Sequence, residues 1–134
     1  MQLGDIRRVL EADVCSRGYQ PDLIVAGGSA ADLMSDVLTY ARAGAVLLTG
    51  LINPQVVRTA EVAAIAAIVF VRGKIPPEET IRLAEENGLP LLTTQLTLFE
   101  ACGRLYAAGL RSRHGAIEDE QTPSRTESPV GLAD

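Results

Sequence analysis

The 134-residue sequence is poor in the residues that mark several specialised protein classes. It has two cysteines, Cys15 and Cys102, which are too few and too far apart for a disulfide framework or a zinc site. We therefore expect no metal and no cofactor. A secretory signal and a run of about 18 apolar residues are both absent, which favours a cytoplasmic protein without membrane contact. Aromatic residues make up only 4 % of the chain, so the core must be mainly aliphatic.

The charge balance argues against a nucleic-acid partner. The formal net charge is −5, and the acidic groups are scattered along the chain without forming a polyacidic tail. No basic stripe of the kind that contacts a phosphate backbone is present. Apolar residues make up 47 % of the sequence, which at this length is enough for one domain with a packed core but not for two.

A stretch near the middle of the chain has the pattern of a βαβ unit. Ala45–Thr49 and Ala67–Val71 are apolar without alternation, which is typical of strands buried on both faces. Between them, Asn53 and Pro54 supply an N-cap residue and a proline at the first helical position. Apolar residues then recur at helical spacing, so the pattern predicts two parallel strands joined by a right-handed helical crossover.

Strand and helix patterns also alternate on both sides of this unit. Further strands are predicted at Asp13–Ser16, Leu23–Ala26 and Leu89–Thr93, and further helices near residues 1–12, 31–42, 77–88 and 97–109. We interpret Gly27-Gly28 as the turn that closes the strand at Leu23–Ala26. The fold class expected is α/β: a single compact three-layer domain with a mostly parallel sheet of four to five strands and helices on both faces.

The periodic pattern ends at Leu110. Residues 111–134 contain two prolines and many small or charged residues without a periodic apolar set, so they are predicted to be a disordered tail. The domain is therefore expected to span residues 1–110. His114, the only histidine, falls in the tail, where catalytic use is not expected.

Motifs for catalysis are missing. The dinucleotide-binding motif GxGxxG does not occur. The phosphate-loop motif GxxxxGK[ST] is also absent, because Gly73-Lys74 lacks the upstream glycine and the following hydroxyl. The carboxylate pairs, including Asp32/Asp36, fit solvated helix faces and have no metal-ligand spacing. The two cysteines fit small core residues better than nucleophiles. We therefore predict no catalytic residue and no kinase activity.

Geometry suggests a binding site, because open parallel sheets bind ligands outside the carboxyl ends of their strands. The helix after Asn53 has no acid in its first turn and could accept an anion. Arg72 is the first charge after an apolar strand. The alternative is a capped turn beside a solvated arginine. The candidate ligand-binding residues are Gly28, Ser29, Thr49, Gly50, Asn53, Arg72 and Thr94.

Four segments also resemble a known family. They are AADLMSDVL (Ala30–Leu38), LLTG (Leu47–Gly50), the long run from Ile68 to Thr94, and TLFE (Thr97–Glu100). Together they are similar to the DRTGG domain and to the N-terminal domain of HPr kinase/phosphorylase. The resemblance covers residues 1–110. The chain departs from the naming motif, with Leu51-Ile52-Asn53 in place of the Asp-Arg run.

This resemblance implies a fold of the HPr-kinase N-domain type, a homodimer and a regulatory role beside catalytic partners. The half of HPr kinase that holds its phosphate loop has no counterpart here. The first hypothesis is thus a stand-alone, non-catalytic regulatory domain that senses a small anionic metabolite or a nucleotide. The second is a scaffold subunit that binds a partner protein without a small-molecule ligand. The third is a small enzyme that uses the strand-end cleft.

Overall fold

A five-stranded sheet runs through the computed structural model, which describes residues 1–113. The strand order is β1-β5-β4-β3-β2. β2, β3, β4 and β5 are parallel, and β1 joins β5 in antiparallel orientation. The strands are β1 (Asp13–Val14), β2 (Gly27–Ala30), β3 (Ala45–Thr49), β4 (Ala67–Phe70) and β5 (Leu91–Thr93). The predicted mostly parallel sheet is confirmed.

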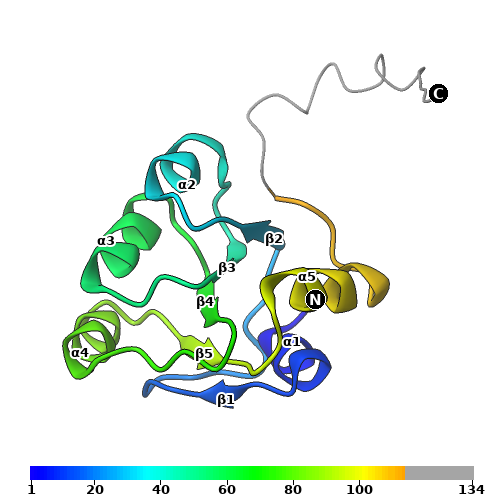
Figure 1. Ribbon diagram of the computed structural model, residues 1–134, viewed down its shortest axis with the longest axis horizontal. Helices are drawn as coiled ribbons and strands as arrows, with labels where there is room; N and C mark the ends of the chain where they lie inside the picture. The colour runs from blue at the N-terminus through cyan, green and yellow to red at the C-terminus, as the bar shows by residue number, and fades with distance from the viewer. Residues whose placement is uncertain (114–134) are drawn as a thin grey trace.

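Helices cover both faces of the sheet, as Figure 1 shows. One face carries α2 (Met34–Tyr40), α3 (Pro54–Val62) and α4 (Glu78–Glu86). The other carries α1 (Leu3–Leu10) and α5 (Leu98–Ala107). Because β2 to β5 follow one another in both sequence and space, three right-handed crossovers place their helices on the same side. The three-layer α/β domain is therefore confirmed, with an unequal pair of helical layers.

The two faces of the sheet bury separate cores. Val46 and Leu48 of β3 pack toward α1 and α5, whereas Ala45 and Leu47 pack toward α2, α3 and α4. All residues of β3, β4 and β5 are buried. The strands lack hydrophobic alternation because both of their faces are covered.

The central βαβ unit lies where the sequence predicts it. β3 has the expected bounds, and α3 begins at Pro54 with Asn53 in the N-cap position. The side chain of Asn53 makes no capping hydrogen bond. The helix start at Thr97 is also confirmed, since its hydroxyl accepts a hydrogen bond from the backbone N–H of Glu100 at 3.2 Å.

The predicted position of β2 was wrong by four residues. The strand occupies Gly27–Ala30 and not Leu23–Ala26, so the glycine pair is strand and not turn. The backbone N–H of Gly28 donates to the carbonyl of Arg111 at 2.9 Å, and its carbonyl accepts from the N–H of Arg113 at 2.7 Å. A Cβ on Gly27 would lie 2.7 Å from the Cβ of Arg113. Glycine is needed here because a segment from the far end of the chain packs directly against the strand.

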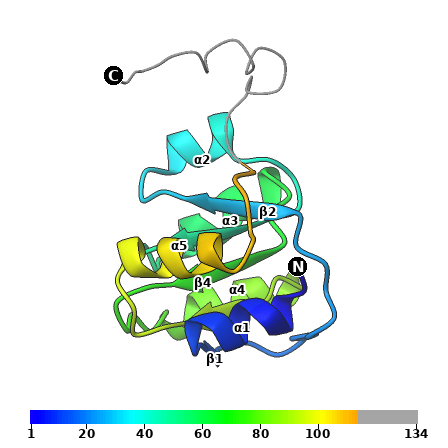
Figure 2. The same ribbon diagram turned by 90° about the vertical axis from the view of Figure 1, so that its right-hand side faces the viewer.

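We call residues 110–113 the strap. In Figure 2 this segment crosses β2 at the outer edge of the sheet. Residues 111–113 of the predicted tail are therefore bonded to the domain. The remainder of that tail, 114–134, including His114, lies outside the described residues. Within residues 1–113, no helix is long and apolar enough to cross a membrane.

Candidate functional site

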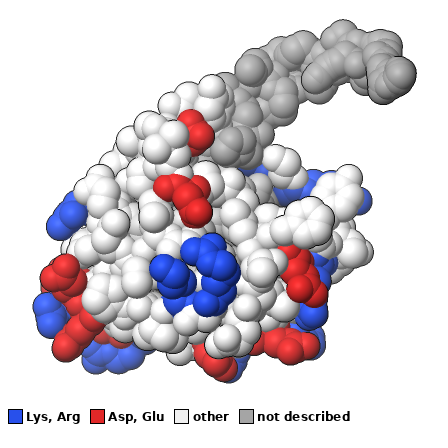
Figure 3. Space-filling model, viewed as in Figure 1, with Lys and Arg blue, Asp and Glu red and all other residues white. Residues whose placement is uncertain are grey.

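The carboxyl ends of the four parallel strands share one edge of the sheet, which we call the carboxyl edge. The strand arrows in Figure 2 point toward this edge, and Figure 3 views it face on. Asp32, Thr49, Gly50, Arg72 and Lys74 all follow or end strands here. The edge is therefore where the predicted binding residues should meet.

Asp32 is anchored to the end of β3. One of its carboxylate oxygens, Oδ1, accepts hydrogen bonds from the backbone N–H of Gly50 at 2.7 Å and from the Thr49 hydroxyl at 3.0 Å. The Thr49 hydroxyl in turn accepts from the N–H of Leu51 at 3.2 Å. Thr49 is fully buried, so its role at the edge is to position Asp32. Sequence reasoning placed Asp32 on a solvated helix face because the strand before it was assigned four residues too early.

Arg72 has an unusual backbone conformation. Its φ is +59°, in the left-handed region, and Gly73 beside it has a φ of +68°. This turn is held from the β5–α5 connection, since the N–H of Arg72 donates to the carbonyl of Leu96 and that of Gly73 donates to the carbonyl of Thr94, each at 2.8 Å. The left-handed turn thus fixes the direction in which the Arg72 side chain leaves β4.

The guanidinium of Arg72 lies directly over Gly50. A Cβ on Gly50 would stand 3.0 Å from Nη2 and 3.2 Å from Nη1 of the arginine. Any side chain larger than hydrogen at position 50 would therefore move the guanidinium. Arg72 is exposed, and its side chain makes no hydrogen bond or ion pair with the part of the chain that the structure describes.

Thr94 faces the interior and not the ligand edge. Its hydroxyl donates to the carbonyl of Leu10 at 2.7 Å and accepts from the N–H of Leu96 at 3.3 Å. The neighbouring Thr93 hydroxyl donates to the carbonyl of Lys74 at 2.7 Å, which supports the loop that carries Arg72. These two threonines therefore build the edge without presenting a free hydroxyl to it.

The remaining predicted residues are spread out. Gly28 and Ser29 lie inside β2 and line a separate cavity, described below, because the strand starts later than predicted. Asn53 is exposed at the start of α3, where the first turn has no acidic residue. The structure thus brings Thr49, Gly50 and Arg72 together, leaves Asn53 at the adjoining helix start, and separates Gly28, Ser29 and Thr94 from them.

Basic side chains gather at the centre of this edge. Figure 3 shows them over the loop that follows β4, with acidic side chains above them. Arg72 and Lys74 are the basic residues of this loop, and Asp32 lies on the β3 side. The edge can therefore offer both cationic donors and a carboxylate acceptor to a ligand.

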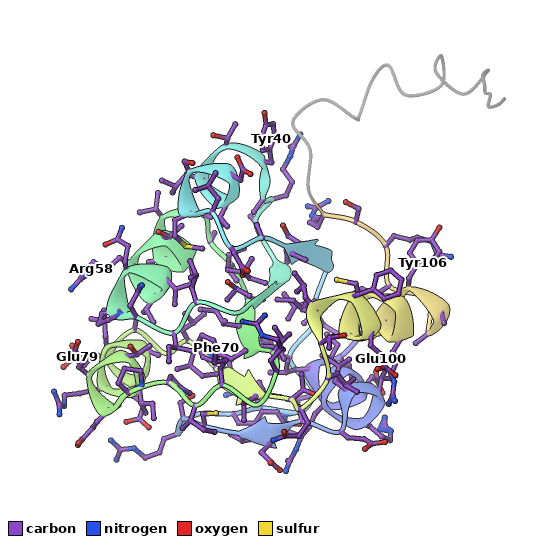
Figure 4. The ribbon with its side chains drawn as sticks, viewed as in Figure 1. Tyr40, Arg58, Phe70, Glu79, Glu100 and Tyr106 are labelled. Carbon is purple, nitrogen blue, oxygen red and sulfur yellow. The ribbon has the colours of Figure 1, made fainter. Side chains whose placement is uncertain are left out.

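Two cavities lie elsewhere. One, of about 290 Å³, is between α5, β2 and the strap. The other, of about 220 Å³, is between α3 and α4, where Figure 4 shows Arg58 and Glu79 at the surface. Neither is lined by Arg72 or Thr49. The two cavities are therefore separate from the residues gathered at the carboxyl edge.

The cysteines are poor nucleophiles in this setting. Burial raises the pKa of the Cys102 thiol, and burial together with the Asp13 carboxylate raises the pKa of Cys15. Both thiols therefore stay protonated at neutral pH. Residues 1–113 contain no group of three or more His, Cys, Asp or Glu side chains that could hold a metal ion.

Comparison with known proteins gives a match in fold. No family model and no curated protein matches the sequence. Among solved structures, the chain is similar to the CBS and DRTGG domains of the regulatory region of a pyrophosphatase from Clostridium perfringens, complexed with the activator diadenosine tetraphosphate. The TM-score is 0.66 at 18 % sequence identity, over 82 % of this chain and 47 % of that chain. The fold is therefore DRTGG-like, as the sequence resemblance implied, and this chain matches under half of the length of that solved chain.

Proposed function

We propose that this chain is a non-catalytic regulatory domain that senses a small anionic ligand, such as the phosphate groups of a nucleotide, at the carboxyl edge. The observation that carries the proposal is the Arg72 guanidinium, laid over Gly50 without an anionic partner among residues 1–113. A guanidinium presents a planar set of donors that matches phosphate and carboxylate oxygens in pairs.

The backbone of Arg72 supports this interpretation. A residue with a side chain costs about 1–2 kcal/mol in the left-handed region, and glycine would avoid that cost. Such strain persists where the surrounding structure enforces it, and it is concentrated at functional sites. Here the strain aims a cation across the end of β3.

The other residues of the edge have distinct roles in this proposal. Lys74 adds a second cation from the same loop, and Asn53 offers a side-chain amide that makes no capping bond. Thr49 and Gly50 hold Asp32, whose second oxygen, Oδ2, can accept a hydrogen bond from a ligand hydroxyl. Gly28, Ser29 and Thr94 are not part of this set.

The fold comparison supports the regulatory half of the proposal. The similar structure comes from a regulatory region and carries a nucleotide activator. The proposal includes a regulatory, non-enzymatic role for this chain in the cytoplasm. The similar structure gives no support to the idea of a small enzyme, because it comes from a regulatory region.

The test is thermal unfolding of the full chain with ATP, AMP, pyrophosphate and inorganic phosphate. A ligand that stabilises the protein should lose its effect in Arg72→Gln and keep it in Arg58→Gln, which removes an equal charge from the exposed face of α3. At a ligand concentration of 100 Kd the stabilisation should be about 2.7 kcal/mol. Gly50→Ala should weaken the response without changing any charge, because the added methyl displaces the guanidinium. An unchanged response in Arg72→Gln, or none to any of the four ligands, would contradict the proposal.

A scaffold role is the second candidate, favoured by exposed apolar side chains. Phe99 on α5 is 90 % exposed and Val62 on α3 is 77 % exposed. The two side chains lie on opposite faces of the sheet, so each would belong to a separate contact surface. A homodimer or a complex with a partner protein would cover them. Analytical ultracentrifugation tests this by comparing the oligomeric state of the wild type with that of Phe99→Ser and Val62→Ser. A wild type that stays monomeric at all concentrations would contradict a homodimer.

A further inference from the structure

The helical layer formed by α1 and α5 is one helix short of covering its face of the sheet. Figure 2 looks onto this face, where α5 lies over the middle of the sheet and only the strap crosses β2. α5 packs against β3, and no helix covers β2 on this side. The apolar surface that remains between α5 and the strap is the cavity of about 290 Å³, which we call the strap groove.

The strap groove has apolar walls and one cation at its rim. Leu48 of β3 forms the floor, Cys102 and Leu105 of α5 form one wall, and Leu110 of the strap forms the other. Arg111 stands at the rim with its guanidinium carbon 4.0 Å from the centre of the Tyr106 ring. Figure 4 shows Tyr106 on the side of α5 near the strap.

Arg111 retains donors for a ligand. Its Nη1 donates to the carbonyls of Tyr106 at 3.0 Å and Leu110 at 3.1 Å, but a guanidinium has five N–H donors in total. It forms no ion pair with any residue from 1 to 113. An apolar groove with an unneutralised arginine at its mouth is complementary to an apolar molecule that ends in an anion.

The size of the groove and the occupied backbone of β2 favour a small molecule over an added strand. An added strand is excluded at Gly28, because its N–H and carbonyl are already bonded to the strap. Small-molecule sites begin at about 300 Å³, which fits the size observed.

We propose that the strap groove binds a small apolar molecule bearing one carboxylate, with the carboxylate on Arg111 and the apolar part against Leu48, Leu105 and Leu110. This site is separate from the carboxyl edge. Because the strap supplies one wall and the charge, occupancy would fix the strap on β2. The bonds of Gly28 to Arg111 and Arg113 would then open less often, which couples the ligand to the chain that follows residue 113.

Octanoate is the probe, and Cys102 is a built-in reporter because it lines the groove. The rate of N-ethylmaleimide labelling at Cys102 is measured by mass spectrometry on the full chain, with Cys15 as the internal control on the other side of the sheet. Saturating octanoate should slow labelling of Cys102 at least fivefold and leave Cys15 unchanged. Octylammonium, which has the same chain and the opposite charge, should not protect.

Arg111→Gln should reduce octanoate affinity about tenfold, whereas Arg113→Gln, which removes an equal charge from the strap outside the groove, should change it less than twofold. Arg111→Lys keeps the positive charge and should retain most of the octanoate affinity. This result would show that the loss in Arg111→Gln comes from the missing charge and not from a folding defect. Equal protection by octylammonium, or equal protection of both cysteines, would overturn the proposal. So would protection of Cys102 that follows protein concentration in the absence of octanoate, because the groove would then be a protein interface.

Discussion

Replacing Arg72 with glycine should stabilise the fold relative to alanine and remove the anion response at the same time. The φ of +59° at Arg72 costs a residue with a Cβ about 1–2 kcal/mol, which glycine avoids. Glycine also lowers the free energy of unfolding by about 0.4–1 kcal/mol, because it increases the conformational entropy of the unfolded chain. The difference leaves Arg72→Gly more stable than Arg72→Ala by roughly 0.5–1 kcal/mol.

The loss of the side chain itself should cost little. The Arg72 side chain is exposed and makes no hydrogen bond or ion pair with residues 1–113, so Arg72→Ala should fall within about 0.5–1 kcal/mol of the wild type. Ala64 offers a matched control, since its φ of +56° carries the same strain away from the carboxyl edge. Ala64→Gly should be stabilising by a similar amount and leave ligand binding unchanged.

Urea unfolding followed by circular dichroism measures these differences, and a gain of 1 kcal/mol corresponds to about 3–5 °C in Tm at this size. If Arg72→Gly were less stable than Arg72→Ala, the left-handed backbone would not be strained and the argument from strain to function would fail. If Arg72→Ala lost several kcal/mol while the anion response survived, Arg72 would be a structural residue and the ligand site would lie elsewhere.

Two further predictions concern buried hydroxyls and the strap. Thr94→Val should cost about 1–3 kcal/mol in urea unfolding, because the Leu10 carbonyl and the Leu96 N–H lose their buried partner. Thr59→Val should be neutral or stabilising, since the Thr59 hydroxyl is buried without a partner among residues 1–113, and an equal loss in both variants would refute this reasoning. A chain ending at residue 113 should melt within about 2 °C of the full chain. One ending at 110 should lose roughly 1.5–4.5 kcal/mol, because it lacks the three backbone hydrogen bonds that Arg111 and Arg113 make with Gly28 and Arg42. Identical melting of the two truncations would show that residues 111–113 contribute nothing.

Local patterns in the sequence were sufficient for the centre of the fold. Ala45–Thr49 reads as a buried strand because every residue is apolar or small, and the structure buries all five. Pro54 marks the start of α3 through its restricted backbone. Thr97 marks the start of α5 through a hydrogen bond to a residue three positions later. These features depend on neighbouring residues alone, so periodicity and capping rules locate them.

The second strand and the site depended on contacts between distant residues. Gly27 and Gly28 have the local pattern of a turn, and they become strand because the strap, more than eighty positions later, packs where a side chain would stand. The same four-residue error hid Asp32, whose bonds to Thr49 and Gly50 exist only once β2 and β3 are in register. The left-handed turn at Arg72 is held by the carbonyl of Leu96, and its guanidinium rests on a glycine from another strand. The sheet could be predicted because the apolar pattern of each strand is local. The geometry of its carboxyl edge was decided by the tertiary structure alone, because contacts between distant residues leave no periodic pattern in a single sequence.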